Sequence, residues 1–228
     1  MTPNQAVYLI SFIVSLVLFG IGFFLSKKQF DRTGNAQFSF LQYFPFELNP
    51  FRKRSAYSYL YPVLTIGGSL GLMLCSVAFV FETNSVNGAL TPSIIFSIVL
   101  FVGLLSFIAL NFIKLSALKA HLVFVVLFVM SVLMLNVLYG FYFLNFETRF
   151  ARDTKDVVRI IASGIAVLNV IFQLVLILNK NFKNWAKLVQ MDADTYVRPK
   201  FAYLPVVEWG NFLSLLITFV PLGIMLYF

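Results

Sequence analysis

The chain has 228 residues, of which 60% are hydrophobic, 18% are aromatic and only 11% are charged. A soluble domain is about half apolar and about a quarter charged, so this surplus of apolar side chains is too large to hide inside one soluble core. The composition excludes a soluble globular domain, a disordered chain and a disulfide scaffold. It indicates an integral membrane protein.

Six apolar stretches are long enough to cross a bilayer as helices. The hydrocarbon core is about 30 Å thick and needs about 20 helical residues. Strands of a β-barrel would alternate apolar and polar residues over about ten positions, whereas runs such as Leu122–Leu135 are apolar on every side. We therefore predict an all-α, single-domain bundle of six transmembrane helices. The predicted spans are Ala6–Leu25, Tyr59–Phe81, Pro92–Ile113, Ala120–Leu144, Val157–Leu178 and Val206–Phe228.

The basic residues predict how this bundle is oriented. Cytoplasmic loops of membrane proteins carry an excess of Lys and Arg. Of the 17 basic residues, all but four fall on the side of the loop that follows the first span. We expect that side to be cytoplasmic, which places both termini outside the plasma membrane. The net charge of +8 is then juxtamembrane charge facing an anionic inner leaflet, and no nucleic acid partner is expected. The four exceptions are Arg149, Arg152, Lys155 and Arg159.

The two long loops on the basic side have distinct compositions. Phe38–Phe51 contains six aromatic residues and two prolines, which predicts an interfacial or shallow re-entrant segment without a regular helix. In Asn179–Leu204, apolar residues recur at helical spacing opposite a lysine-rich flank. This pattern is typical of an amphipathic surface helix. The apolar members are Phe182, Trp185, Leu188 and Val189, and the lysines are Lys180, Lys183 and Lys187.

Neutral polar residues within the spans form the candidate functional face. Asn169 and Gln173 lie one helical turn apart in the fifth span, so they share a face. Amides in hydrocarbon seek partners on neighbouring helices, and depth favours Asn136 in the fourth span over Asn111 in the third. We interpret the face as a structural contact that holds neighbouring helices together. The alternative is the polar wall of a substrate cavity.

Small residues predict where helices approach one another closely. Gly67, Gly71 and Cys75 fall at i, i+4 and i+8 in the second span, and Ser11 and Ser15 form a small pair in the first. Such patterns allow close backbone contact in membranes. They do not show whether the contact lies within one chain or between chains.

Charged residues are confined to the ends of the spans. Glu208 opens the sixth span and is expected to pair with Arg198 or Lys200, while Arg159 is expected to pair with Asp156. His121, the one histidine, is interpreted as a polar helix-end residue.

Signatures of catalysis and of cofactor binding are missing from the sequence. It contains no Walker A or HExxH motif, and its one cysteine cannot form an intramolecular disulfide. We therefore predict no catalytic, metal or cofactor site. The first functional hypothesis is a non-enzymatic subunit or scaffold of a membrane complex, contacting another membrane protein or a second copy of itself. The alternatives are a small-solute permease or channel and a lipid-modifying enzyme. The Phe-rich composition is typical of low-GC bacterial membrane proteins.

Overall fold

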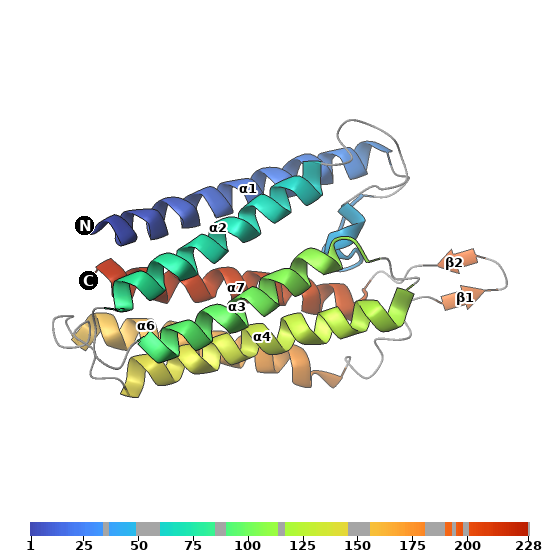
Figure 1. Cartoon of the computed structure of the whole chain (residues 1–228). Helices are drawn as coiled ribbons and strands as arrows, with labels where there is room; N and C mark the ends of the chain where they lie inside the picture. The colour runs from blue at the N-terminus through green and yellow to red at the C-terminus, as the bar shows by residue number, and fades with distance from the viewer. Residues whose placement is uncertain are drawn as a thin grey trace.

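The computed structural model describes residues 1–33, 37–48, 60–84, 90–113, 117–145, 156–180, 190–192, 195–197 and 201–227. Within these ranges, six long helices lie side by side in a bundle (Figure 1). Each is long and apolar enough to cross a membrane. The prediction of six such helices is confirmed. The helices are α1 (Pro3–Thr33), α2 (Leu60–Thr83), α3 (Leu90–Leu110), α4 (Leu118–Asn145), α6 (Asp156–Leu178) and α7 (Tyr203–Tyr227).

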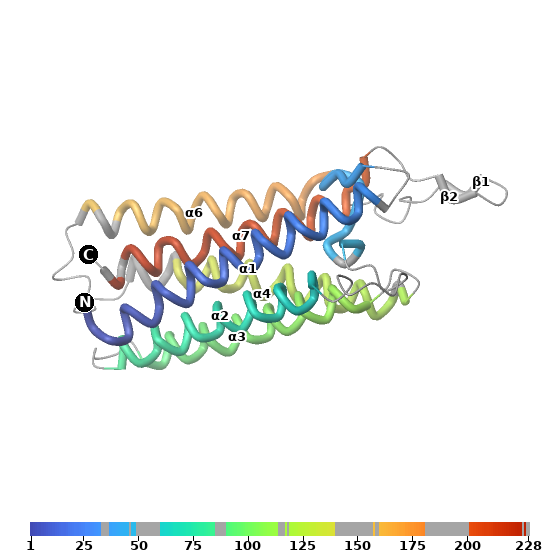
Figure 2. Tube along the Cα trace, turned by 90° about the horizontal axis from the view of Figure 1, so that it is seen from above, coloured from blue at the N-terminus to red at the C-terminus, as the bar shows by residue number. Residues whose placement is uncertain are grey.

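Short elements lie at one end of the bundle, and both termini lie at the other (Figures 1 and 2). The short elements are the 3-10 helix η1 (Pro45–Leu48) and an antiparallel hairpin of β1 (Gln190–Asp192) and β2 (Thr195–Val197). We call their end of the bundle the η1 end. The hairpin was not predicted. The predicted amphipathic surface helix falls mainly on residues 181–189, which lie outside the described residues.

Helix α1 begins earlier and ends later than its predicted span. It begins at Pro3 because Thr2 and Gln5 form a reciprocal cap: the Gln5 backbone N–H donates to Thr2 Oγ1 at 3.2 Å, and the Thr2 N–H donates to Gln5 Oε1 at 2.9 Å. Proline suits the first helical position because its missing N–H would have no partner there. Beyond residue 25, an ion pair of 2.6 Å between Lys27 and Asp31 supports the helix across one turn.

The predicted small-residue face of α2 packs against α1 of the same chain. A Cβ added to Gly71 would lie 3.1 Å from the backbone oxygen of Ser11 and would also meet Ser15. The thiol of Cys75 lies 3.4 Å from the backbone oxygen of Tyr8. The two small-residue pairs that the sequence singled out therefore meet each other, and this contact is within the chain.

An aromatic cluster closes the η1 end. Phe38 packs edge to face against Phe23 and Phe30 of α1, and Trp209 of α7 packs against the same ring. The indole N–H of Trp209 donates to the backbone oxygen of Tyr43 at 2.9 Å. The loop predicted to be interfacial thus folds back onto the helices, and its side chains at Phe38, Phe44 and Leu48 are buried.

Candidate functional site

Amide and hydroxyl side chains from three helices meet in the interior of the bundle. Asn136 comes from α4, and Asn169 and Gln173 come from α6. Helix α7 contributes a further amide and two hydroxyl groups. None of the six side chains is more than 4% exposed. We call this set the polar network: Asn136, Asn169, Gln173, Asn211, Ser214 and Thr218.

Four amides of the polar network form a directional chain of hydrogen bonds. Asn169 Nδ2 donates to Asn136 Oδ1 at 2.9 Å, and Asn136 Nδ2 donates to Gln173 Oε1 at 2.9 Å. Gln173 Nε2 then donates to Asn211 Oδ1 at 2.8 Å. The chain ends on a backbone oxygen of α7, that of Val207, at 2.8 Å from Asn211 Nδ2. The amides therefore tie α6 to α4, and α6 to α7.

The two hydroxyl groups of α7 donate to amide oxygens of Asn169 and Asn136. Ser214 Oγ donates to Asn169 Oδ1 at 2.8 Å. Thr218 Oγ1 lies 2.8 Å from both Asn136 Oδ1 and the backbone oxygen of Ser214, and its single proton serves one of them at a time. Asn169 Nδ2 also donates to the Ser214 backbone oxygen at 2.9 Å.

In the part of the chain that the structure describes, every buried nitrogen and oxygen atom in the side chains of the polar network has a hydrogen-bond partner. Interhelical bonds of this kind contribute about 0.6–2 kcal/mol each in membranes. The geometry is that of a structural contact that connects α4, α6 and α7.

The predicted contact between Asn136 and Asn169 is confirmed by the structure. Asn111, the other partner considered, donates instead to the backbone oxygen of Phe107 in its own helix at 2.8 Å. The α7 members were missed in the sequence analysis. Their signal was present, because Asn211, Ser214 and Thr218 are separated by three and four residues, the spacing of one helix face.

A buried histidine–glutamate pair lies nearer the η1 end. His121 Nε2 of α4 is 2.9 Å from Glu208 Oε1 of α7, with side chains 0% and 1% exposed. The expected partners of Glu208, Arg198 and Lys200, lie outside the described residues, and the structure pairs its carboxyl group with His121. His121 lies near the start of α4, as the sequence analysis expected. Its complete burial was not predicted. The side chain of Arg159 lies outside the described residues.

The second ring nitrogen of His121 limits the protonation states of this pair. His121 Nδ1 is 3.3 Å from the backbone oxygen of Ile113. Because a carbonyl oxygen only accepts, Nδ1 carries a proton in this contact. The bond to Glu208 then holds one further proton, either on His121 Nε2 or on the carboxyl group, and the pair is net neutral in both cases. In the described ranges, no three His, Cys, Asp or Glu side chains gather in a way that would hold a metal ion.

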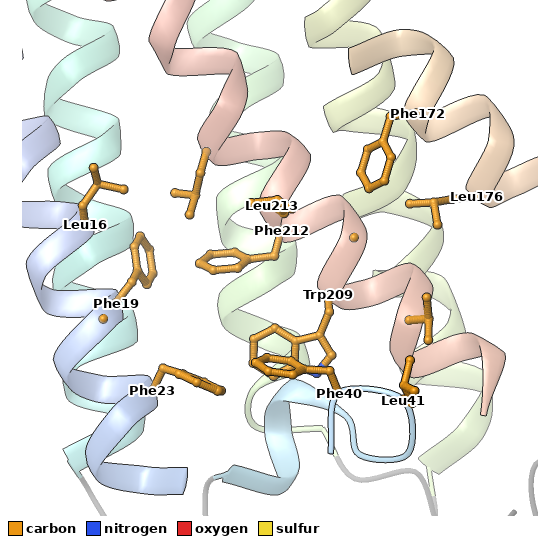
Figure 3. Close-up of a pocket in the computed structure, with 14 residues that line it drawn as sticks. Leu16, Phe19, Phe23, Phe40, Leu41, Phe172, Leu176, Trp209, Phe212 and Leu213 are labelled. Atoms are coloured by element: carbon orange, nitrogen blue, oxygen red, sulfur yellow. The ribbon is translucent and has the colours of Figure 1, made fainter. Parts of the chain in front are cut away.

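An apolar groove of about 560 Å³ opens between α1 and α6, with α7 as its floor (Figure 3). Phe23 of α1, together with Phe40 and Leu41 of the loop before η1, marks its η1 end. The indole nitrogen of Trp209 is a polar atom in its lining, and it already donates to the backbone oxygen of Tyr43. The lining therefore suits an apolar occupant.

Comparison with known proteins identifies no relative of this chain. No protein-family model, no curated protein and no solved structure matches it.

Proposed function

We propose that the chain is a non-enzymatic integral membrane subunit of a larger membrane complex. Its six helices cross the plasma membrane with both termini outside. The length and apolar character of all six helices support membrane insertion. Among the described residues, basic side chains at the η1 end support a cytoplasmic, anionic-lipid-facing location for that end. They are Lys27, Lys28, Arg32, Lys119 and Lys180.

The observation that carries the proposal is the outward face of α1. Only 22% of the most apolar stretch of α1 is buried, against 33–50% in the other five helices. Large apolar residues recur along this face every three or four positions and are 45–64% exposed, the spacing of a helix–helix seam. We call this face the α1 stripe. Its members are Ile10, Val14, Val17, Ile21 and Phe24.

The polar network supports a structural role over transport. A permease path needs polar groups that are available to a solute or to water. The amides of Asn136, Asn169 and Gln173 bond to one another and to α7 instead. A transport role would require this contact to open, and the experiment below includes that alternative.

The test is site-specific photo-crosslinking in native membranes. A photoreactive amino acid replaces Val17, which lies in the α1 stripe and is 50% exposed. The matched control replaces Val126 of α4, which is 56% exposed. We expect a discrete protein adduct from position 17 that is weaker or missing at position 126. The adduct partner, identified by mass spectrometry, should copurify with the unmodified chain in mild detergent.

Two outcomes would contradict the subunit proposal. In one, both positions yield lipid adducts alone, which places the α1 stripe against the bilayer. In the other, the purified chain alone moves a small solute into vesicles and Asn169→Leu stops that flux without unfolding the protein. An adduct of the chain with itself would identify the complex as a homo-oligomer.

A further inference from the structure

We propose that the apolar groove between α1 and α6 binds one acyl chain of an anionic phospholipid from the inner leaflet. This inference rests on the proposed membrane insertion and orientation. It requires no partner protein, so it stands or falls separately from the subunit proposal.

The depth of the groove matches one leaflet. Its lining runs along α7 from Val206 to Leu216, which is about 15 Å at a helical rise of about 1.5 Å per residue. That length is half of a hydrocarbon core of about 30 Å. The groove begins at the η1 end (Figure 3), and its lining ends at Leu216, near the middle of α7. An acyl chain of a lipid in that leaflet would lie along the groove over this distance.

The volume of the groove suits a small apolar ligand such as a lipid chain. The groove offers about 560 Å³, which falls within the usual range of about 300–1,000 Å³ for small-molecule sites. Gly20 helps to keep it open, because a Cβ added there would meet no atom within 4 Å.

Charge at the mouth of the groove selects an anionic headgroup. Lys27 continues the groove face of α1 one turn beyond Phe23, and Lys180 follows Leu176 of α6 by four residues. Lys27 pairs with Asp31. Lys28 and Arg32 add positive charge to the same end of α1, although they continue the α1 stripe and not the groove face. Lys180 is exposed. A phosphate-bearing headgroup with a net negative charge would complement this mouth.

The test uses Trp209, which lines the groove, as a fluorescent reporter. Trp185→Phe removes the other of the two tryptophans. The purified protein is reconstituted in phosphatidylcholine vesicles in two series. One series contains increasing fractions of phosphatidylglycerol brominated in the acyl chain, and the other contains increasing fractions of phosphatidylcholine brominated in the same way. We expect half-quenching of Trp209 at a mole fraction about fivefold lower for the brominated phosphatidylglycerol. Equal quenching by the two lipids, or no quenching by either, would overturn the proposal.

Variants distinguish the binding site of the acyl chain from the binding site of the headgroup. Gly20→Phe fills the groove and should abolish the phosphatidylglycerol preference. Gly164→Phe is the matched control, because a Cβ at Gly164 also meets nothing within 4 Å and Gly164 is not in the groove lining. Combined Lys27→Gln and Lys180→Gln should equalise the two lipids while both still quench. A preference that survives Gly20→Phe would overturn the groove assignment. The comparison of the two lipids in the Trp185→Phe protein decides the matter even if the groove variant fails to insert.

Discussion

Asn169 shows how a polar side chain is held inside an apolar bundle. Its amide nitrogen donates to Asn136 and to the backbone of Ser214, and its amide oxygen accepts from the Ser214 hydroxyl group. An unpartnered amide in such surroundings would cost several kcal/mol. The position of Asn169 therefore determines which faces of α4, α6 and α7 can meet.

Removing Asn169 should destabilise the bundle modestly. Asn169→Leu leaves Asn136 Oδ1 and the Ser214 hydroxyl group with fewer partners, and we expect a loss of about 1–2 kcal/mol in the free energy of unfolding. Adding Asn136→Leu also removes the amide that lost its hydrogen bond to Asn169. The double variant should therefore lose less than the sum of the two single variants in a thermal or denaturant melt in detergent. Strict additivity would contradict direct coupling between these two residues.

The His121–Glu208 pair should respond differently to each substitution. Glu208→Gln keeps a donor amide for neutral His121 Nε2, and we expect a loss below about 1.5 kcal/mol. His121→Leu leaves the Glu208 carboxyl group buried without its partner at 2.9 Å, which should cost about 3–5 kcal/mol. Chemical unfolding in detergent measures both values. If Glu208→Gln costs as much as His121→Leu, the pair does not stabilise the fold in this way.

The amide contact was predictable from the sequence, but the histidine–glutamate pair was not. Asn136 and Asn169 lie away from the ends of long apolar runs, so depth alone brought them to the same level. His121 and Glu208 were both placed at the basic ends of their spans, yet they are 87 residues apart. Depth does not show which helices are lateral neighbours, and basic residues nearer in sequence offered Glu208 a simpler partner.

At the scale of elements, glycines of α2 allow it to approach α1 closely. Gly67 and Gly68 of α2 face Leu18 and Phe19 of α1 at distances that leave little room for a Cβ, and Gly71 faces the Ser11 backbone. The groove lies on another flank of α1, which leaves the α1 stripe facing outward. Helix α1 thus has three distinct faces.

Gly71→Leu should disrupt the α1–α2 contact. The new side chain has no space beside Ser11 and Ser15, so we expect overpacking to cost about 1–3 kcal/mol. Gly164→Leu is the control, because its Cβ meets nothing within 4 Å and leucine favours helix more than glycine does. Thermal melts of both variants in the same detergent check this. A Gly71→Leu protein that melts like its parent would show that the contact yields without cost.

The six helices were predictable because their apolar runs match the thickness of a bilayer. The residues at which the helices begin and end were less predictable. Helix α1 gains a first turn from its Thr2–Gln5 cap, a polar feature that a search for apolar residues ignores. The packing of the loop around Phe38 onto the helices was not predicted, because aromatic composition alone does not distinguish a membrane surface from a protein surface.

For the whole molecule, both termini lie at one end and η1 lies at the other (Figure 1). This arrangement, combined with the basic residues at the η1 end, leads to an expected outcome for fusion proteins. Alkaline phosphatase fused after Phe228 should be active, and the same enzyme fused after Lys180, beyond α6, should be inactive because it stays in the cytoplasm. Fluorescence from a cytoplasm-dependent reporter after Phe228 would reverse the orientation.

The central claim is that this chain works as one subunit of a membrane complex. The most direct measurement is its mass after gentle extraction from native membranes, by blue-native electrophoresis combined with mass spectrometry of the excised band. We predict a discrete species heavier than the 25.9 kDa chain that contains either a second membrane protein or further copies of this one. Weakening the α1 stripe by Val17→Ala and Ile21→Ala should shift the chain toward the monomer. A lone 25.9 kDa species from native membranes would contradict the account.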